Sequence, residues 1–174
     1  MSLLGKHSNI ILVGFMGSGK TSVGLELSIK TNMDFIDTDF QLTELFGMSI
    51  SEYFTAHNEE EFRMEEQKII TKVCKRMNQV VGTGGGAFLD QQSRTTMLNS
   101  GTVIWLKASE QSIISRIESD TGTIRPLLTT GNLKDNISTL LSERQKIYNE
   151  AHINVETDNL SPVEISDIIL TKMK

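Results

Sequence analysis

A glycine-rich segment near the N-terminus carries the clearest chemistry in the sequence. Gly14–Thr21 (GFMGSGKT) fits the phosphate-loop pattern G-x-x-x-x-G-K-[ST], in which backbone amides point at phosphate oxygens. In this pattern Lys20 supplies positive charge to the β- and γ-phosphates, and Thr21 offers its hydroxyl to Mg²⁺. An apolar strand pattern precedes the segment and a helix pattern follows it, as the motif requires. The predicted nucleotide contacts are Gly17, Ser18, Gly19, Lys20, Thr21 and Ser22.

Two aspartates flank Thr38 directly after a second apolar run, Phe35-Ile36. While the chain stays extended, alternation puts Asp37 and Asp39 on the same side, so that one could serve Mg²⁺ and the other a substrate hydroxyl. Two like charges so close need cations around them. The alternative is that Asp39 only caps a helix that begins at Phe40, and the residues alone leave both interpretations open.

Three of the six arginines stand where a charged ligand could use them. Arg125 precedes Pro126 in the polar segment Asp120–Leu133, and an arginine in such a loop can deliver positive charge to a transferring phosphoryl group. Arg63 lies one turn into a long helix with an acidic start, and Arg144 lies in a polar helix. For each of them, a solvated surface side chain is the alternative.

Short apolar runs alternate with amphipathic stretches, which predicts a parallel sheet flanked by helices. The expected strands are Asn9–Val13, Phe35-Ile36, Val80–Thr83, Thr102–Lys107 and Ile153–Glu156. Helices are expected over Lys20–Lys30, after Asn58, after Ser109 and from Ser161-Pro162, where Asn and Ser can cap the free amides. A second glycine cluster, Gly82 with Gly84–Gly86, follows the third strand, so that two glycine clusters predict two walls of one site.

Composition limits the classes of function. The 174 residues predict a single domain over residues 1–174, and a formal net charge of −5 excludes a broad basic face for nucleic acid. No apolar run approaches the roughly 20 residues that span a bilayer, so no membrane partner is expected. The single cysteine, Cys74, suits a reducing compartment, and a cytoplasmic location is expected.

In combination, these residues resemble the shikimate kinase family, and the resemblance extends over essentially the whole chain. It implies a three-layer α/β fold of the P-loop NTPase type, with a five-stranded parallel sheet in the order 2-3-1-4-5. It also implies a mobile lid at about residues 120–134 and a shikimate-binding region at about residues 38–66. The implied reaction is Mg²⁺-dependent phosphorylation of the shikimate 3-hydroxyl by ATP, in aromatic amino acid biosynthesis, and a monomeric enzyme is expected.

The resemblance assigns catalytic and metal-binding roles. Asp39 matches the aspartate that binds substrate hydroxyls and accepts the proton, and Asp37 matches an aspartate that helps Thr21 to hold Mg²⁺, commonly through water. Lys20 belongs to the phosphate loop, and Arg125 reaches the phosphates from the lid. These two cations and Asp39 are the predicted catalytic residues.

The resemblance also assigns the substrate contacts. Arg63 and Arg144 match two arginines that grip the shikimate carboxylate, and Glu66 matches a glutamate that supports the first of them. Gly84–Gly86 matches a glycine triplet that lets the substrate lie against backbone, and Arg116 could reach the adenine of ATP. Fork-shaped guanidinium groups suit a planar carboxylate, which agrees with arginine rather than lysine at both positions.

Two alternatives remain at this point. One is a related small-molecule kinase that acts on gluconate or a nucleoside monophosphate, although Arg63, Arg144 and the glycine triplet favour a compact carboxylate. The other is a catalytically idle nucleotide-binding module, which would be favoured if Lys20, Asp39 or Arg125 were missing; all three are present.

Overall fold

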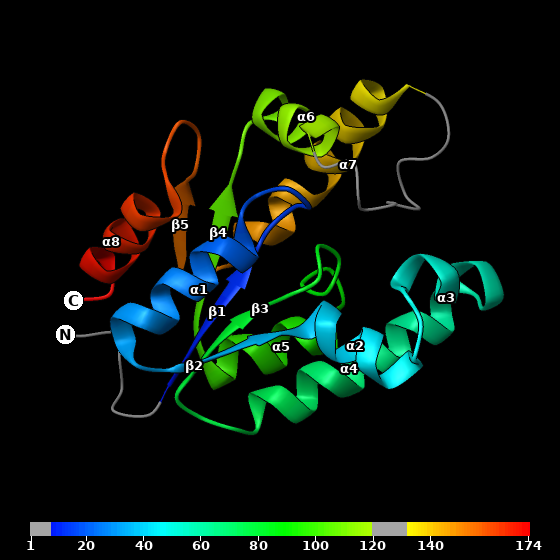
Figure 1. Ribbon diagram of the computed structural model, residues 1–174, viewed down its shortest axis with the longest axis horizontal. Helices are drawn as coiled ribbons and strands as arrows, with labels where there is room; N and C mark the ends of the chain where they lie inside the picture. Colours follow the sequence, from blue (N-terminus) through cyan, green and yellow to red (C-terminus); the bar gives the residue numbers. More distant parts are fainter. Residues whose placement is uncertain (1–7, 120–131) are drawn as a thin grey trace.

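Five strands form one parallel sheet in the order β2-β3-β1-β4-β5, as expected (Figure 1). The computed structural model describes residues 8–119 and 132–174. The strands are β1 (Asn9–Val13), β2 (Asp34–Asp37), β3 (Gln79–Gly82), β4 (Gly101–Lys107) and β5 (Ile153–Glu156). Every predicted strand is present, and the bounds differ from the expected ones by at most one residue at either end.

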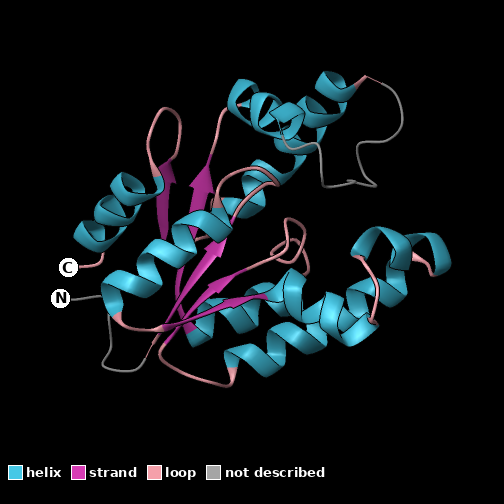
Figure 2. Ribbon diagram, in the orientation of Figure 1, coloured by secondary structure: helices cyan, strands magenta, loops and turns pink. Residues whose placement is uncertain are grey.

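Helices cover both faces of this sheet and give the three-layer α/β arrangement that was predicted (Figure 2). They are α1 (Lys20–Thr31), α2 (Thr38–Phe46), α3 (Ile50–Ala56), α4 (Glu59–Cys74), α5 (Gln91–Ser100), α6 (Glu110–Ser119), α7 (Leu133–Tyr148) and α8 (Pro162–Lys172). Across the described residues, no helix has the length and apolar character needed to cross a bilayer.

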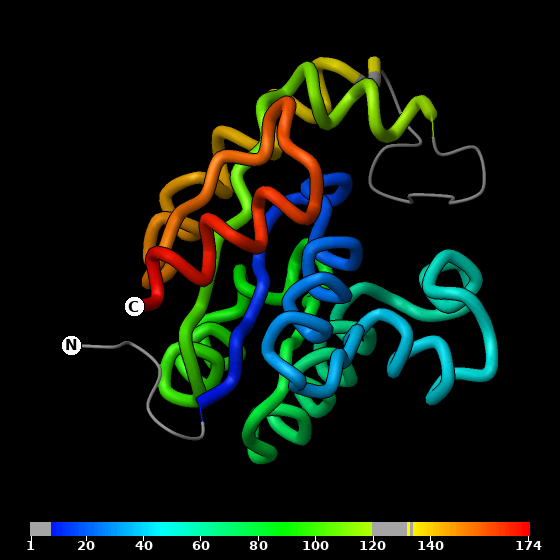
Figure 3. The backbone as a smooth tube through the Cα atoms, turned by 60° about the vertical axis from the view of Figure 1, so that its left-hand side comes forward, coloured from blue at the N-terminus to red at the C-terminus, as the bar shows by residue number. Residues whose placement is uncertain are grey.

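Alternation along the buried strands divides the core into two layers. Ile11 and Val13 of β1 pack with residues of α4, α5 and α7, while Ile10 and Leu12 pack with residues of α1 and α8. All four side chains are fully buried, as expected for a strand covered on both faces. Figure 3 shows α8 and β5 on the opposite side of the molecule from α2 and α3.

Helix starts follow the predicted caps. The Asn58 side chain accepts a hydrogen bond from the Glu61 amide at the start of α4, and Ser161 and Glu164 form a reciprocal capping box with Pro162 at the first position of α8. Ser109 accepts from the Ser112 amide at the start of α6. Cys74 and Trp105 are buried in the core, as predicted.

The carboxyl ends of three neighbouring strands bring the two glycine clusters together. In the register, Leu12 of β1 pairs with Gly82 of β3, which in turn pairs with Asp37 of β2. Three segments therefore meet at one edge of the sheet: the chain between β1 and α1, the start of α2, and the chain after β3. β1 lies between β3 and β4, where the order of connections reverses, and such a switch point is the common ligand site of open α/β sheets.

Candidate active site

The phosphate loop adopts a backbone that its glycines permit. Gly14, Gly17 and Gly19 have positive φ angles of 144°, 77° and 97°, and a Cβ at Gly14 would lie 2.6 Å from the Leu106 carbonyl oxygen. The Lys20 Nζ donates to the carbonyl oxygens of Gly14 (2.8 Å) and Phe15 (2.9 Å). The lysine therefore lies across its own loop, directly over the place where the motif holds phosphate.

Asp37 joins the phosphate loop to α2. Its Oδ2 accepts a hydrogen bond from the Thr21 hydroxyl (3.0 Å), and its Oδ1 accepts from the amides of Asp39 (3.0 Å) and Phe40 (3.3 Å). The expectation of extended chain through Asp39 was wrong, because α2 begins at Thr38. Asp37 caps this helix in place of Asp39, since its carboxylate satisfies the free amides of the first turn.

A cavity of about 330 Å³ gathers most of the predicted nucleotide and metal residues. Its lining consists of Gly17, Gly19, Lys20, Thr21, Ser22, Asp37, Asp39, Thr83 and Arg116. Both aspartates therefore reach the same cavity, although Asp37 caps α2 and Asp39 lies in its first turn. Thr83 was not predicted, and its side chain donates to the Leu12 carbonyl oxygen at the end of β1 (3.0 Å).

Asp39 lies in an environment that makes its carboxylate more basic. Burial raises its pKa, and the negative charge of Asp37 adds to the rise, while Lys20 and Arg63 act in the opposite direction. A carboxylate with a raised pKa is a better proton acceptor than a free aspartate. The two cations favour the ionised form, which is the form that can accept a proton.

The glycine triplet after β3 allows three charged side chains to converge. A Cβ at Gly84 would lie 2.6 Å from Asp39 Oδ1 and 2.8 Å from Glu66 Oε1, and a Cβ at Gly86 would lie 2.6 Å from Arg63 Nη1. The triplet was expected to let the substrate lie against backbone. Glycine has a second role here, because these charged side chains occupy the space that a larger residue would fill.

Arg63 is held in place by carboxylates on its own helix. Its Nη1 donates to Glu66 Oε2 (2.6 Å), and its Nη2 lies 3.2 Å from Glu59 Oε1. Glu66 is 3% exposed, and burial raises its pKa while Arg63 opposes the rise. The pairing of Glu66 with Arg63 is confirmed, and it orients one edge of the guanidinium group.

Arg144 is not a solvated surface side chain. It is 7% exposed, and its guanidinium carbon lies 5.3 Å from the centroid of the Phe15 ring in the phosphate loop. Such a position over an aromatic face stabilises a cation. Phe15 and Tyr148, one turn beyond Arg144 on α7, were both missed, although the four-residue spacing to Tyr148 places it on the same face of the helix.

Arg116, the arginine expected to reach adenine, lies against the phosphate loop. Arg116 donates from Nη1 to the Gly17 carbonyl oxygen (3.0 Å) and from Nη2 to the Thr157 carbonyl oxygen (3.0 Å), so that it joins the phosphate loop to the segment after β5. Thr157 was not predicted. Arg125 and residues 120–131 of the lid predicted at about residues 120–134 lie outside the described residues, and the end of that range already belongs to α7.

An acceptor hydroxyl brought to Asp39 would face the phosphate loop across one cleft, and this is the arrangement of a P-loop kinase that phosphorylates a small molecule. The family model for shikimate kinase matches residues 16–174. The chain belongs to the shikimate kinase family, and its activity is ATP-dependent phosphorylation of the shikimate 3-hydroxyl.

Individual relatives agree with this assignment. The chain is 37% identical to shikimate kinase from Caldicellulosiruptor saccharolyticus over 163 residues, which cover 94% of each chain. It is also 37% identical to shikimate kinase from Legionella pneumophila over 166 residues, with 95% of this chain and 94% of that one covered. The solved shikimate kinase from Acinetobacter baumannii in complex with shikimate has a TM-score of 0.91 and 31% identity, and covers 95% of this chain and 92% of its own.

Proposed function

We propose that the cleft between the phosphate loop and Gly84–Gly86 holds ATP and shikimate together, and that Asp39 accepts the proton of the 3-hydroxyl. The observation that carries this proposal is the position of the Asp39 carboxylate directly beside Gly84, where the positive charges of Lys20 and Arg63 act on it. Its raised pKa suits proton acceptance. The Acinetobacter relative, solved with shikimate, supports a substrate site in the same fold.

The reaction needs alignment and charge neutralisation more than covalent help from the protein. Asp39 orients the hydroxyl and takes its proton as the oxygen attacks the γ-phosphorus. Lys20 neutralises charge on the β- and γ-phosphates, and Arg125 supplies a second cation in the proposed lid. The Ser18 hydroxyl is buried without a hydrogen-bond partner among the described residues, which fits a loop that awaits phosphate oxygens.

Arg63 and Arg144 are proposed to grip the shikimate carboxylate. Both are largely removed from solvent, so a carboxylate between them would form charge-assisted hydrogen bonds in a medium of low dielectric. Glu66 fixes the Nη1 group of Arg63, while Nε and Nη2 contact the exposed Glu59, which a substrate carboxylate would have to displace.

Arg63→Lys is expected to raise KM for shikimate by about 10- to 100-fold, because an ammonium group cannot reproduce a bidentate grip. KM for ATP is expected to stay nearly unchanged. Steady-state kinetics with each substrate varied in turn measures both constants. Arg76→Lys is the matched control, since Arg76 is exposed just beyond α4. An effect confined to the KM for ATP would refute the assignment.

Thr21 and Asp37 are proposed to hold Mg²⁺, which would neutralise charge on the β- and γ-phosphates of ATP. Their oxygens are of the type that Mg²⁺ prefers, and they already lie together at 3.0 Å. In the described ranges, no group of three or more His, Cys, Asp or Glu side chains forms a metal cage. An ion here would therefore take most of its ligands from phosphate and water, as Mg²⁺ commonly does.

Asp37→Asn is expected to raise the Mg²⁺ concentration for half-maximal activity by roughly tenfold, the usual cost of a lost metal-supporting carboxylate. Activity should return at high Mg²⁺ concentration. Asp34→Asn, at the exposed start of the same strand, serves as the control. Rates measured over a Mg²⁺ series at saturating ATP decide the matter, and an unchanged Mg²⁺ dependence would remove Asp37 from the metal site.

Arg116 is proposed to border the adenine of ATP, since it spans the phosphate loop and Thr157 at the rim of the cavity.

We also propose a single kinase domain over residues 1–174 that acts as a cytoplasmic monomer, with neither nucleic acid nor membrane as a partner. The net charge of −5 supports the absence of nucleic acid as a partner.

The test of the whole proposal is ADP release from ATP and Mg²⁺ with shikimate, gluconate and nucleoside monophosphates in parallel. Turnover with shikimate, and little with the other acceptors, is the expected result. Folded protein without shikimate-dependent ADP release would overturn it. Turnover with gluconate alone would keep the kinase fold and Asp39 as base, but would mean that Arg63 and Arg144 bind the carboxylate of an open-chain sugar acid and not that of shikimate.

A further inference from the structure

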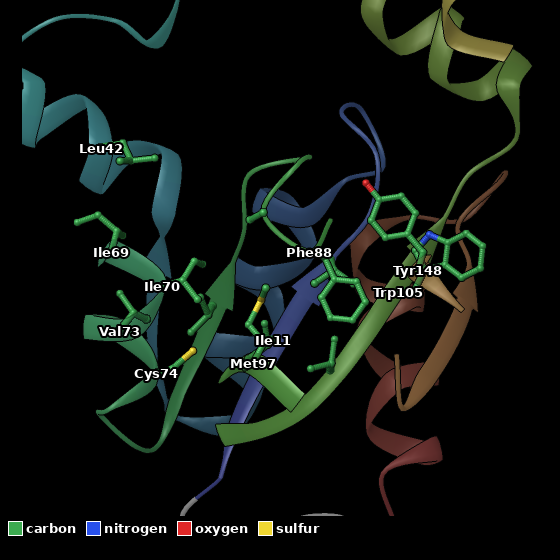
Figure 4. Packing of buried hydrophobic residues seen from close by; sticks show 14 of the residues in the cluster. Ile11, Leu42, Ile69, Ile70, Val73, Cys74, Phe88, Met97, Trp105 and Tyr148 are labelled. Atoms are coloured by element: carbon green, nitrogen blue, oxygen red, sulfur yellow. The ribbon is translucent and has the colours of Figure 1, made fainter. Parts of the chain in front are cut away.

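Tyr148, the last residue of α7, has an unusual position for a hydroxyl group. The residue is 1% exposed, and its ring lies beside those of Trp105 and Phe88, with ring centroids 5.6 Å and 6.4 Å away (Figure 4). Burial raises the pKa of the phenol to about 12, so the group is neutral and remains a hydrogen-bond donor. Packing alone would be served as well by phenylalanine, which makes the hydroxyl the feature to explain.

The hydroxyl donates to the carbonyl oxygen of Gly85, at 2.5 Å. Gly85 is the middle residue of the triplet that forms the proposed substrate wall, and the two groups are 63 positions apart in the sequence. The triplet lies in no strand or helix, so this contact ties an otherwise irregular segment to the end of a long helix. The bond is partly buried, so loss of the donor would leave the carbonyl oxygen with an unmade hydrogen bond in a place largely closed to water.

The charges of the two proposed carboxylate-binding arginines act on the same phenol group. A hydrogen bond and the positive charge of Arg144 act against the rise in the Tyr148 pKa, and the charge of Arg63 does so as well. Arg144 thus has two neighbours, the Phe15 ring, whose centroid is 5.3 Å from its guanidinium carbon, and the Tyr148 phenol. Tyr148 is 1% exposed and does not line the cavity, so it can act on a substrate only through its neighbours.

We propose that Tyr148 is a positioning residue for shikimate, which sets Arg144 and the Gly85 carbonyl relative to each other before the substrate binds. This rests on the proposed role of Arg144. Without the hydroxyl, the wall and the arginine sample arrangements that do not bind, and the apparent affinity falls in proportion to the competent fraction. Once shikimate is bound the arrangement is restored, so the rate of phosphoryl transfer is retained.

Tyr148→Phe tests the proposal, because it keeps the ring packing and removes only the hydroxyl. KM for shikimate is expected to rise about three- to tenfold, with kcat and the KM for ATP within about twofold of wild type. Ser166→Ala is the matched control: Ser166 is fully buried in α8, and its hydroxyl donates to the Val163 carbonyl oxygen (2.7 Å) away from the cleft. The control is expected to lower the melting temperature without a change in KM for shikimate.

An unchanged KM for shikimate in folded Tyr148→Phe enzyme overturns the proposal, and so does an equal rise in both KM values. Arg144→Lys and the double variant separate this failure from a failure of the proposed function. If Tyr148 acts through Arg144, the double variant raises KM for shikimate by less than the product of the two single effects. If Arg144→Lys alone leaves KM for shikimate unchanged, the carboxylate assignment fails, and the role of Tyr148 fails with it.

Discussion

Asp39→Asn is expected to lower kcat by about 10²- to 10⁴-fold, the usual contribution of a general base. The amide keeps the size of the side chain and can still accept a hydrogen bond, but it cannot take the proton of the 3-hydroxyl. KM for ATP is expected to change little, because the phosphate loop and Lys20 remain in place. Rapid-quench or steady-state kinetics with saturating substrates measures the effect directly.

The matched control is Asp167→Asn, which removes a carboxylate that is exposed on α8 and paired with Lys30. It is expected to retain wild-type kcat, so that loss of a negative charge alone does not explain the effect. Asp39→Asn activity within a few-fold of wild type would show that Asp39 is not the base. Binding of shikimate to the variant, measured by calorimetry, would then separate a positioning role from none.

The raised pKa of Asp39 gives the pH dependence a definite sign. Proton acceptance needs the ionised carboxylate, so kcat/KM falls as the pH falls through this pKa, which burial and Asp37 place above that of a free aspartate. Stability has the opposite dependence: a native-state pKa above the unfolded value means that ionisation of Asp39 lowers stability as the pH rises. Asp39→Asn should therefore unfold at no lower temperature than wild type at neutral pH.

The elements that hold the site followed from local patterns. Alternating burial, capping residues and the glycine motif determine the strands and most helix starts, because each depends on neighbours close in sequence. The start of α2 did not follow, because Asp37 is both the last residue of β2 and the cap of α2, so that no extended chain separates the strand from the helix. α3 is seven residues long and was not predicted, because so short a helix shows little periodicity.

The environment of the site depended on contacts between distant segments. The family resemblance indicated the pairing of Arg63 with Glu66, but the position of Arg144 beside Phe15, more than 120 residues away, did not follow from the sequence. The Tyr148 contact with Gly85 is of the same kind. No local pattern specifies which side chain will lie under a loop, so these features required the packed structure.

Gly84→Ala is expected to lower kcat/KM for shikimate by about 10²-fold, the typical cost of moving a catalytic group by about 1 Å. The added methyl group would lie 2.6 Å from Asp39 Oδ1 and 2.8 Å from Glu66 Oε1, so both carboxylates must move. Gly84 has no positive φ, and the atoms in conflict are ends of side chains. The backbone can therefore keep its conformation, and the melting temperature should change little while activity is lost.

Neighbouring substitutions in the triplet make this prediction specific. Gly86→Ala would place its methyl group 2.6 Å from Arg63 Nη1, so it should act mainly on the KM for shikimate. Gly85→Ala meets only the Met16 amide nitrogen, at 3.3 Å, and a shift of a few tenths of an ångström relieves it, so its effect should be smallest. Equal losses in all three variants would mean that glycine is needed here only for the conformation of the backbone. Unequal losses would mean that glycine is required because Asp39, Glu66 and Arg63 fill the space that a larger side chain would need.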